Sequence, residues 1–274
     1  RGPSGRYLYR PENPDAMVEA EINGIVYNYE TAGEGDPVLL IPGYGGSTGF
    51  WRKVVAVLAE RFTTICVDNR GAGGTVCGPG FTIGDMAADA AALLDRLGVG
   101  PAHVIGWSMG SHVAQRLAID HPAAVRSLTL VSTYGRRPAR SAYLLDAAVR
   151  AVEEGAAPEL IGIALNTLNY TEGFFGGKEA DGTPIRVSDI DDIVMAKAQM
   201  DAVNASDTSD EARLIAAPAL CIHGTDDIMI DISEGERIAG TIPDCRFLRI
   251  EGEGHWIPVA AYLPAVLDFI GAQR

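Results

Sequence analysis

Gly106-Trp107-Ser108-Met109-Gly110 is the stretch of this sequence that decides its fold. It stands between an apolar run at 102–105, typical of a buried strand, and a segment with helical spacing that ends at the His121-Pro122 break. Glycines two residues before and two residues after a serine allow the backbone angles of a sharp turn. The pattern therefore predicts a strand, a tight elbow that presents the serine hydroxyl, and a helix, in that order.

The same alternation of apolar strands and helices extends along the first half of the chain. It predicts strands at 37–41, 62–67, 102–105 and 125–131, and helices at 50–61, 82–97 and 108–120, after a hairpin of strands 18–22 and 25–31 that turns at Asn23-Gly24. Thr82 and Asp85 could cap the second helix reciprocally. Apolar strands that alternate with helices indicate a mostly parallel sheet covered on both faces.

The alternation stops after Thr133 and resumes with strands at 219–222 and 246–250, each followed by a helix. Between them we expect helices at 143–154, 158–169 and 188–205, and a mobile glycine-rich stretch at 171–177 that continues through 181–184. The sequence therefore predicts an α/β core of about eight strands (17–133 and 214–274), a helical cap (134–213) and a flexible N-terminal segment (1–16).

Composition restricts the partners of the protein. The chain has 274 residues, of which 47% are hydrophobic, a formal net charge of −14 and a pI near 4.7. Clustered lysine and arginine, on which binding to nucleic acid or to anionic lipid depends, are not expected on such a chain. The four cysteines lie far apart, which favours reduced thiols. No apolar run is long enough for a membrane helix, and the start of the sequence, at 1–6, lacks an apolar signal core. We expect a cytoplasmic protein, and the sequence leaves its oligomeric state open.

Two later strand ends carry the groups that nucleophilic serine chemistry requires. Asp226 and Asp227 follow the strand at 219–222, and His255 follows the strand at 246–250. A serine hydroxyl is scarcely ionised near neutral pH, so it needs a base within hydrogen-bond reach and an acid that orients the base. Because the carboxyl ends of parallel strands meet at one edge of a sheet, serine, acid and histidine could converge there.

These motifs resemble the α/β-hydrolase superfamily, in which the chain order is serine, acid, histidine. The resemblance covers nearly all residues from about 17 to 272 and diverges in the cap. It implies that Ser108 is the nucleophile and His255 the base. In the family the acid usually stands three residues after the glycine that follows its strand, which favours Asp227, with Asp226 as the alternative. No cofactor or metal is implied.

The resemblance also implies an oxyanion hole formed by two backbone amides. One belongs to Met109, after the nucleophile, and the other to Tyr44, in the loop after the strand at 37–41. The family often has His-Gly where this chain has Pro42-Gly43, a departure that raises the question of how the loop is braced.

Aromatic residues near the expected site and in the cap favour an apolar substrate. We expect contacts with the substrate from Tyr44, Trp256, Tyr134, Tyr143, Phe174 and Phe175. Other polar residues have structural explanations: satisfied side chains for His103, His112, His121 and His223, and turn chemistry for Asp68 and Arg70. The stretch Gly71-Ala72-Gly73-Gly74 lacks the spacing and the lysine of a phosphate-binding loop.

The leading interpretation is a serine hydrolase that cleaves a carboxylic ester or lactone of small to medium apolar character. Ser-Met-Gly at the elbow is also similar to cofactor-free haloperoxidases and perhydrolases, to enol-lactonases and to carbon–carbon bond hydrolases of the superfamily. A natural-product tailoring enzyme is equally compatible. An alternative of another class is a small-molecule receptor that retains the triad.

Overall fold

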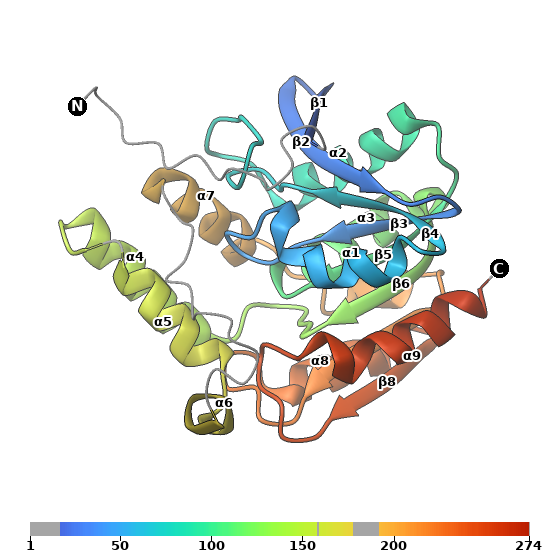
Figure 1. The fold of residues 1–274 in the computed structure, drawn as a ribbon. Coiled ribbons are helices and arrows are strands. Elements are labelled where there is room, and N and C mark those ends of the chain that lie inside the picture. Colours follow the sequence, from blue (N-terminus) through green and yellow to red (C-terminus); the bar gives the residue numbers. More distant parts are fainter. Residues whose placement is uncertain (1–16, 158, 178–191, 274) are drawn as a thin grey trace.

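A single eight-stranded sheet forms the centre of the molecule (Figure 1). The computed structural model describes residues 17–157, 159–177 and 192–273. The sheet order is β1-β2-β4-β3-β5-β6-β7-β8. The strands are β1 Met17–Ile22, β2 Ile25–Ala32, β3 Asp36–Ile41, β4 Phe62–Val67, β5 Ala102–Trp107, β6 Val125–Val131, β7 Ala219–Gly224 and β8 Cys245–Ile250.

The strand pairing follows from the local sequence. Asn23 and Gly24 adopt positive φ angles of 47° and 77°, which is the twist that a two-residue hairpin turn needs, and β1 pairs antiparallel with β2. β2 also pairs antiparallel with β4, and all later pairs are parallel. The predicted strands are confirmed, although β5 and β7 each run two residues further than expected.

Helices cover both faces of the sheet. On one face, α1 Arg52–Leu58 and α9 Val259–Gly271 pack on the apolar side chains of the inner strands. On the other face lie α2 Ile83–Leu97, α3 Met109–Asp120 and α8 Ile232–Thr241. Continuous apolar strands can be buried in this way only in a sheet with two covered faces.

The helix starts and ends show where local sequence decided the structure. The predicted capping box of α2 is present, because Thr82 accepts from the amide of Asp85 and the Asp85 carboxylate accepts from the amide of Thr82. The helix predicted at 50–61 is shorter, since a 3-10 turn at Thr48–Trp51 precedes α1 and the chain turns after Leu58 to enter β4.

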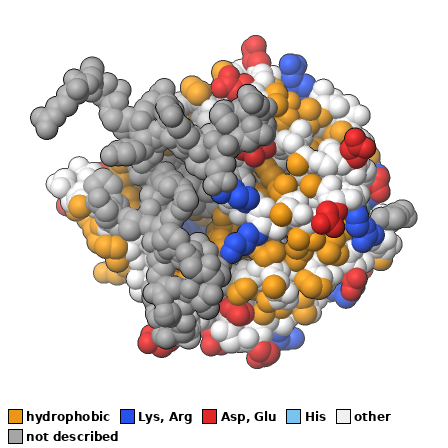
Figure 2. Space-filling model, in the orientation of Figure 1, with side chains coloured by type: hydrophobic (Ala, Val, Ile, Leu, Met, Phe, Trp, Pro, Cys, Tyr) orange, Lys and Arg blue, Asp and Glu red, His pale blue; other side chains and the backbone are white. Residues whose placement is uncertain are grey.

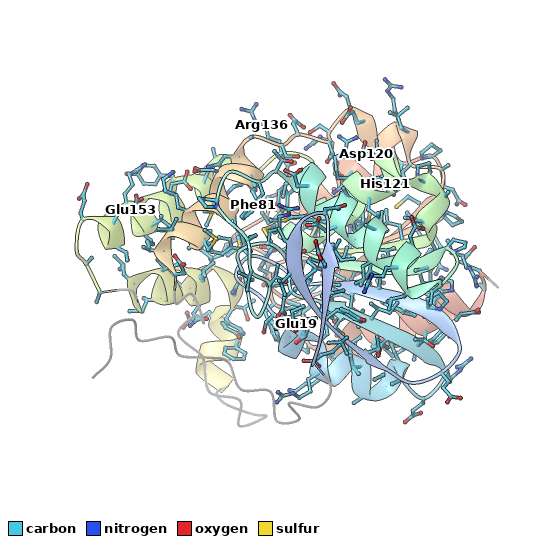
Figure 3. The ribbon with its side chains drawn as sticks, turned by 90° about the horizontal axis from the view of Figure 1, so that it is seen from above. Glu19, Phe81, Asp120, His121, Arg136 and Glu153 are labelled. Atoms are coloured by element: carbon cyan, nitrogen blue, oxygen red, sulfur yellow. The ribbon has the colours of Figure 1, made fainter. Side chains whose placement is uncertain are left out.

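The described residues between β6 and β7 include the α-helices α4 Ala139–Glu153, α5 Glu159–Asn169, α6 Glu172–Gly177 and α7 Ile193–Asn204. They form one side of the molecule (Figure 1). In Figure 3 the labelled Glu153 of α4 lies on that side, whereas Asp120 and His121, at the end of α3, lie on the other. α3 therefore ends on the side away from the inserted helices.

The glycine-rich stretch at 171–177 is a correction to the sequence interpretation. It forms the short helix α6, because the Thr171 hydroxyl accepts a hydrogen bond from the amide of Phe174 at 3.2 Å and so caps the first turn. The continuation at 181–184, the start of the helix predicted at 188–205 and the segment 1–16 lie outside the described residues.

The surface mixes charges of both signs. Figure 2 shows acidic and basic side chains interspersed over the face in view, with hydrophobic side chains between them. In the described ranges, no helix combines the length and the apolar character needed to span a bilayer.

Candidate active site

The turn between β5 and α3 has the geometry that its two glycines predict. A Cβ atom on Gly106 would lie 2.3 Å from the carbonyl oxygen of Gly110, and one on Gly110 would lie 2.1 Å from that of Ile41. Ser108, between them, has φ 54° and ψ −119°, a conformation that L-residues rarely adopt. Its side chain does not cap α3, so the ordinary explanation of a serine at a helix start does not apply.

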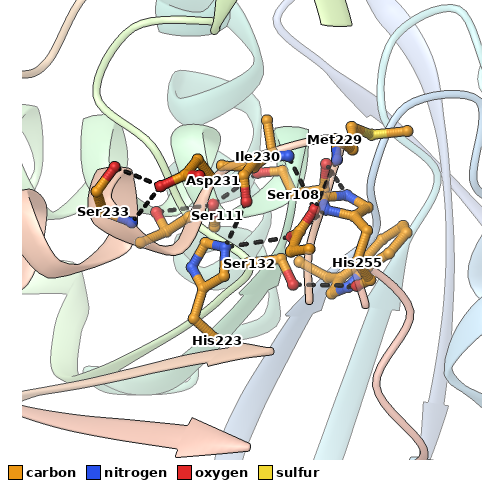
Figure 4. A network of polar contacts seen from close by, with 12 residues as sticks. Ser108, Ser111, Ser132, His223, Met229, Ile230, Asp231, Ser233 and His255 are labelled. Carbon is orange, nitrogen blue, oxygen red and sulfur yellow. Dashed lines mark hydrogen bonds and ion pairs between the residues drawn. The ribbon is translucent and has the colours of Figure 1, made fainter. Parts of the chain in front are cut away.

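Ser108, His255 and Asp227 form a continuous hydrogen-bonded chain, part of which is labelled in Figure 4. The Ser108 Oγ lies 2.9 Å from Nε2 of His255, and Nδ1 of the same ring lies 2.8 Å from Oδ2 of Asp227. Because the carboxylate can only accept, the Nδ1 atom carries the proton and the Nε2 atom is free to accept the proton of Ser108. All three side chains are buried or nearly so, with Ser108 the most exposed at 8%.

Asp227 is held and kept ionised by its surroundings. Its Oδ1 atom accepts hydrogen bonds from the amides of Met229 at 2.9 Å and Ile230 at 2.8 Å. Burial alone would raise the pKa of Asp227, but the neighbouring His255 and His223 outweigh burial and lower it to about 2. The carboxylate is therefore negative at neutral pH and stabilises a positive charge on His255.

The structure distinguishes the two candidate acids. The side chain of Asp226 is exposed and accepts a hydrogen bond from its neighbour Thr225 at 3.0 Å. Asp227, one residue later, points to His255. The spacing that favours Asp227 thus agrees with the geometry.

Two further contacts hold the backbone of the histidine turn. The carbonyl oxygen of His255 accepts from the Ser132 hydroxyl at 3.0 Å and from the Trp107 indole at 3.3 Å. Ser132 has a φ of 51°, a second strained residue beside the site. The sequence interpretation missed Ser132, whose only signal was its place directly after a predicted strand.

His223 is a second histidine at the acid. Its Nε2 atom lies 2.9 Å from the carbonyl oxygen of Ile230 and 3.2 Å from Oδ2 of Asp227, and the ring is fully buried. The sequence interpretation treated it as a satisfied polar side chain. Its Nε2 atom has two partners, one of which is the carboxylate that orients His255, whereas its buried Nδ1 atom has no hydrogen-bond partner among the described residues.

Tyr44 and Met109 border the same pocket as Ser108. Neither of their backbone amides has a backbone acceptor among the described residues. They are the two residues that the sequence interpretation expects to supply the amides of an oxyanion hole.

The pocket above Ser108 has about 550 Å³ of empty space, including its open mouth. Apart from the hydroxyl and imidazole of the hydrogen-bonded chain, most of its wall is apolar or aromatic. It is lined by Tyr44, Trp107, Ser108, Met109, Tyr134, Arg137, Ser141, Leu145, Leu165, Asn169, Met200, Val203, Met229, Ile230 and His255.

Only some of the expected substrate contacts reach this wall. Tyr44 and Tyr134 do. Tyr143 does not, since it is 78% exposed on the outer face of α4, whereas Ser141 and Leu145, one helical turn apart, face the pocket. The structure therefore does not bring Tyr143 to the pocket wall.

Trp256 and Phe174 pack on other aromatic rings and are not among the lining residues. The Trp256 ring centroid lies 5.7 Å from that of Trp107 and 5.3 Å from that of Phe50, and Phe174 stacks on Tyr170 at 4.0 Å. The structure brings neither to the pocket wall. The side chain of Phe175 lies outside the described residues.

His103 and His112 are not among the residues that line the pocket. His103 Nδ1 lies 2.7 Å from the Ser127 hydroxyl oxygen, and His112 Nε2 lies 2.8 Å from that of Ser206. Burial lowers the pKa of His112 to about 4, so this ring is neutral at physiological pH.

Asp68 and Arg70 stabilise turns, as the sequence interpretation expects. The Asp68 carboxylate accepts from the amides of Thr48 at 2.6 Å and Gly74 at 2.7 Å. Arg70 makes a two-pronged ion pair with the buried Asp89. In the described part of the chain, no group of three or more His, Cys, Asp or Glu side chains is arranged to hold a metal ion.

Comparison with known proteins places this architecture in a family. The family model described as alpha/beta hydrolase fold matches residues 36–260. This chain belongs to the α/β-hydrolase family, as its sheet order and the glycine-flanked serine elbow indicate.

Its relatives carry several activities in their names. A putative non-heme bromoperoxidase, BpoC, of Mycobacterium tuberculosis is 33% identical over 234 residues, which cover 83% of this chain and 89% of the relative. A putative carbamate hydrolase, RutD, of Variovorax paradoxus is 30% identical over 254 residues, which cover 89% of this chain and 95% of that protein. The enol-lactonase of Burkholderia xenovorans LB400 superimposes with a TM-score of 0.84 at 25% identity and covers 93% of this chain and 100% of its own.

Proposed function

We propose that this protein hydrolyses a carboxylic ester or lactone of small to medium apolar character through an acyl-enzyme on Ser108. The observation that carries the proposal is the chain of hydrogen bonds from Ser108 through His255 to Asp227, which opens into a largely apolar pocket. A strained serine with an accepting imidazole nitrogen at 2.9 Å is the arrangement that nucleophilic catalysis requires.

The proposed reaction begins when His255 Nε2 takes the proton of Ser108 while Oγ attacks the carbonyl carbon of the substrate. The amides of Tyr44 and Met109 donate to the oxyanion of the tetrahedral intermediate. The imidazolium, stabilised by Asp227, then gives its proton to the leaving alcohol as the acyl–oxygen bond breaks.

In the second half, His255 takes a proton from a water molecule, which attacks the acyl-enzyme carbonyl and forms a second tetrahedral intermediate. Collapse of this intermediate expels Ser108 Oγ, which recovers its proton from His255. The carboxylic acid product leaves, and the chain of hydrogen bonds is restored.

The pocket wall supports an apolar substrate. Leu145 and Leu165 come from α4 and α5, and Met200 and Val203 come from α7, so the inserted helices would contact the part of the substrate that lies beyond the carbonyl. We further propose that residues 134–213 act as a cap that selects the substrate. The enol-lactonase likeness at 25% identity is compatible with a cyclic ester.

A second candidate is perhydrolysis, in which hydrogen peroxide replaces water as the acceptor of the acyl group. The specific observation in its favour is the 33% identity to a putative non-heme bromoperoxidase. In this reaction a peroxide oxygen attacks the acyl-enzyme and a peracid leaves, so the residues are the same and only the nucleophile of the second half differs.

A panel of aryl esters and lactones of graded acyl length tests the proposal, with and without hydrogen peroxide. We expect turnover of short and medium apolar substrates and a loss of several orders of magnitude in Ser108→Ala, because the three side chains act as a unit. Peracid formation at the expense of acid would favour the second candidate. A Ser108→Ala protein that retains more than about a tenth of the activity would contradict both.

A further inference from the structure

The loop between β3 and α1 carries the Tyr44 amide. This loop has Pro42 where the family often has a histidine, and its hydrogen bonds show what holds it in place. Within the loop, the Gly46 amide donates to the carbonyl oxygen of Gly43 at 3.0 Å. From the loop after β4, the Asn69 side chain donates to the carbonyl oxygen of Pro42 at 3.1 Å. These bonds hold the two ends of the turn but leave its tip, at Tyr44 and Gly45, to be held from elsewhere.

The tip is held by the inserted helix α7. The amide of Gly45 donates to Oε1 of Gln199 at 2.9 Å, and the Tyr44 hydroxyl donates to the carbonyl oxygen of Ala196 at 3.2 Å. Both acceptors lie on α7, one turn apart. A helix that lies between β6 and β7 in the sequence thus holds Tyr44, whose amide is the expected oxyanion donor, and Gly45, the residue that follows it.

Gln199 also binds a second loop. Its Nε2 atom donates to the carbonyl oxygen of Arg70 at 2.7 Å, and the side chain is fully buried. The backbone N–H of Gly45 can only donate, and the carbonyl oxygen of Arg70 can only accept. If the side-chain amide of Gln199 were turned round, its NH₂ group would face the Gly45 N–H and its oxygen would face the Arg70 oxygen. Gln199 is therefore held in one orientation and bridges the loops that follow β3 and β4.

Gln199 is not part of the pocket wall, whereas its neighbour Met200 is. Successive residues of a helix point in different directions, so α7 directs Met200 to the substrate and Gln199 to the loop that carries the Tyr44 amide. Substrate contact and loop support thus share one rigid element.

We propose that Gln199 is a positioning residue that holds the Tyr44 amide in place for the oxyanion and so couples α7 to the chemical step. The inference rests on the proposed function, because it concerns the same oxyanion. Removal of a whole oxyanion donor costs about 100- to 1,000-fold in kcat. A donor that is retained but no longer held should cost less, about 10- to 100-fold.

The alternative is that Gln199 only fastens α7 to the core. Both readings predict lower stability when the amide is lost, but only the positioning role predicts a specific loss of kcat. Gln115 offers a control, since it is also a fully buried glutamine whose amide bridges segments without touching the loop of Tyr44. Its side chain bonds to the hydroxyl groups of Thr133 and Thr208 and to the backbone oxygen of Tyr134, and it makes no bond to the Tyr134 ring at the pocket wall.

The experiment compares Gln199→Met and Gln115→Met in steady-state hydrolysis of a short-chain aryl ester, with thermal unfolding measured for both. Methionine has a similar volume but neither donor nor acceptor at its end. We expect both variants to unfold at lower temperature. Gln199→Met should lose about 10- to 100-fold in kcat with KM changed by less than about threefold, and Gln115→Met should keep kcat within about twofold.

A Gln199→Met protein with kcat within about twofold of wild type, or with the whole loss in KM, would overturn the positioning role. So would an equal loss of kcat in Gln115→Met. Gln199→Asn, whose side chain is one methylene shorter and cannot span both loops, carries the same expectation if the methionine variant does not fold. A wild-type chain without ester turnover would instead refute the proposed function, and the role of Gln199 with it.

Discussion

Replacement of Asp227 by asparagine tests the orienting role of the acid with almost no change in shape. Asp227 Oδ1 accepts from two backbone amides and Oδ2 accepts from His255, whereas asparagine has one oxygen for both sides. The oxygen should stay with the two amides, since the opposite orientation loses two hydrogen bonds. The NH₂ group then faces Nδ1 of His255 and forces its proton onto Nε2.

A histidine with its proton on Nε2 cannot take the proton of Ser108. The wrong tautomer lowers kcat by about 10⁴-fold in the serine protease case, which corresponds to about 5 kcal/mol, and we expect a similar loss here. The assay is steady-state hydrolysis of a short-chain aryl ester by purified Asp227→Asn. Asp226→Asn is the control, and its activity should lie within about twofold of wild type because that side chain is exposed.

The same variant has a signature in the pH dependence of stability. The pKa of Asp227 is lowered from 3.8 to about 2, so its ionised form stabilises the folded state above pH 3.8 and that contribution is lost as the pH falls toward 2. It amounts to about 2 kcal/mol. The free energy of unfolding of wild type should therefore fall more steeply in this range than that of Asp227→Asn. An Asp227→Asn enzyme within tenfold of wild type, or a larger loss in Asp226→Asn, would refute the assignment of the acid.

Two further predictions concern the elbow and a helix cap. Gly110→Ala should destabilise the protein by more than about 2 kcal/mol or prevent folding, because the alanine Cβ would lie 2.1 Å from the backbone oxygen of Ile41. Denaturant unfolding measures the loss of stability. An unfolding midpoint equal to that of wild type would contradict the packing of the elbow. Thr82→Ala should cost about 1 kcal/mol through loss of the α2 capping box, with kcat unchanged; a change below about 0.3 kcal/mol would show that the cap contributes little.

Much of the fold could be predicted from the sequence because its signals are local. The buried strands are rich in apolar residues, the hairpin turns at Asn23-Gly24, and α2 begins at a capping box. The elements that differed depend on less regular signals. Thr171 supplies the cap that makes α6 from a glycine-rich stretch, and the 3-10 turn before α1 has no distinct periodicity.

The hydrogen-bonded chain of the candidate site could also be predicted, since three strand ends meet at one edge of a parallel sheet. The pocket wall could not, because the orientation of each inserted helix depends on tertiary packing. The orientation of α4 about its own axis determines that Leu145 faces the pocket and that Tyr143 faces solvent. The contact between Gln199 and Gly45 joins segments distant in the chain, and the contact between His223 and Asp227 depends on a turn. Neither could be predicted from the local sequence pattern.

Reaction with a fluorophosphonate, followed by intact mass measurement and peptide mapping, tests the reactivity of Ser108 most directly. A fluorophosphonate is attacked by an activated serine and stays bound, so no knowledge of the substrate is needed. We expect one adduct on Ser108 in wild type, no adduct in Ser108→Ala and greatly slowed labelling in His255→Ala. A wild-type protein that forms no adduct, or an adduct that persists in Ser108→Ala, would contradict the proposed role of Ser108.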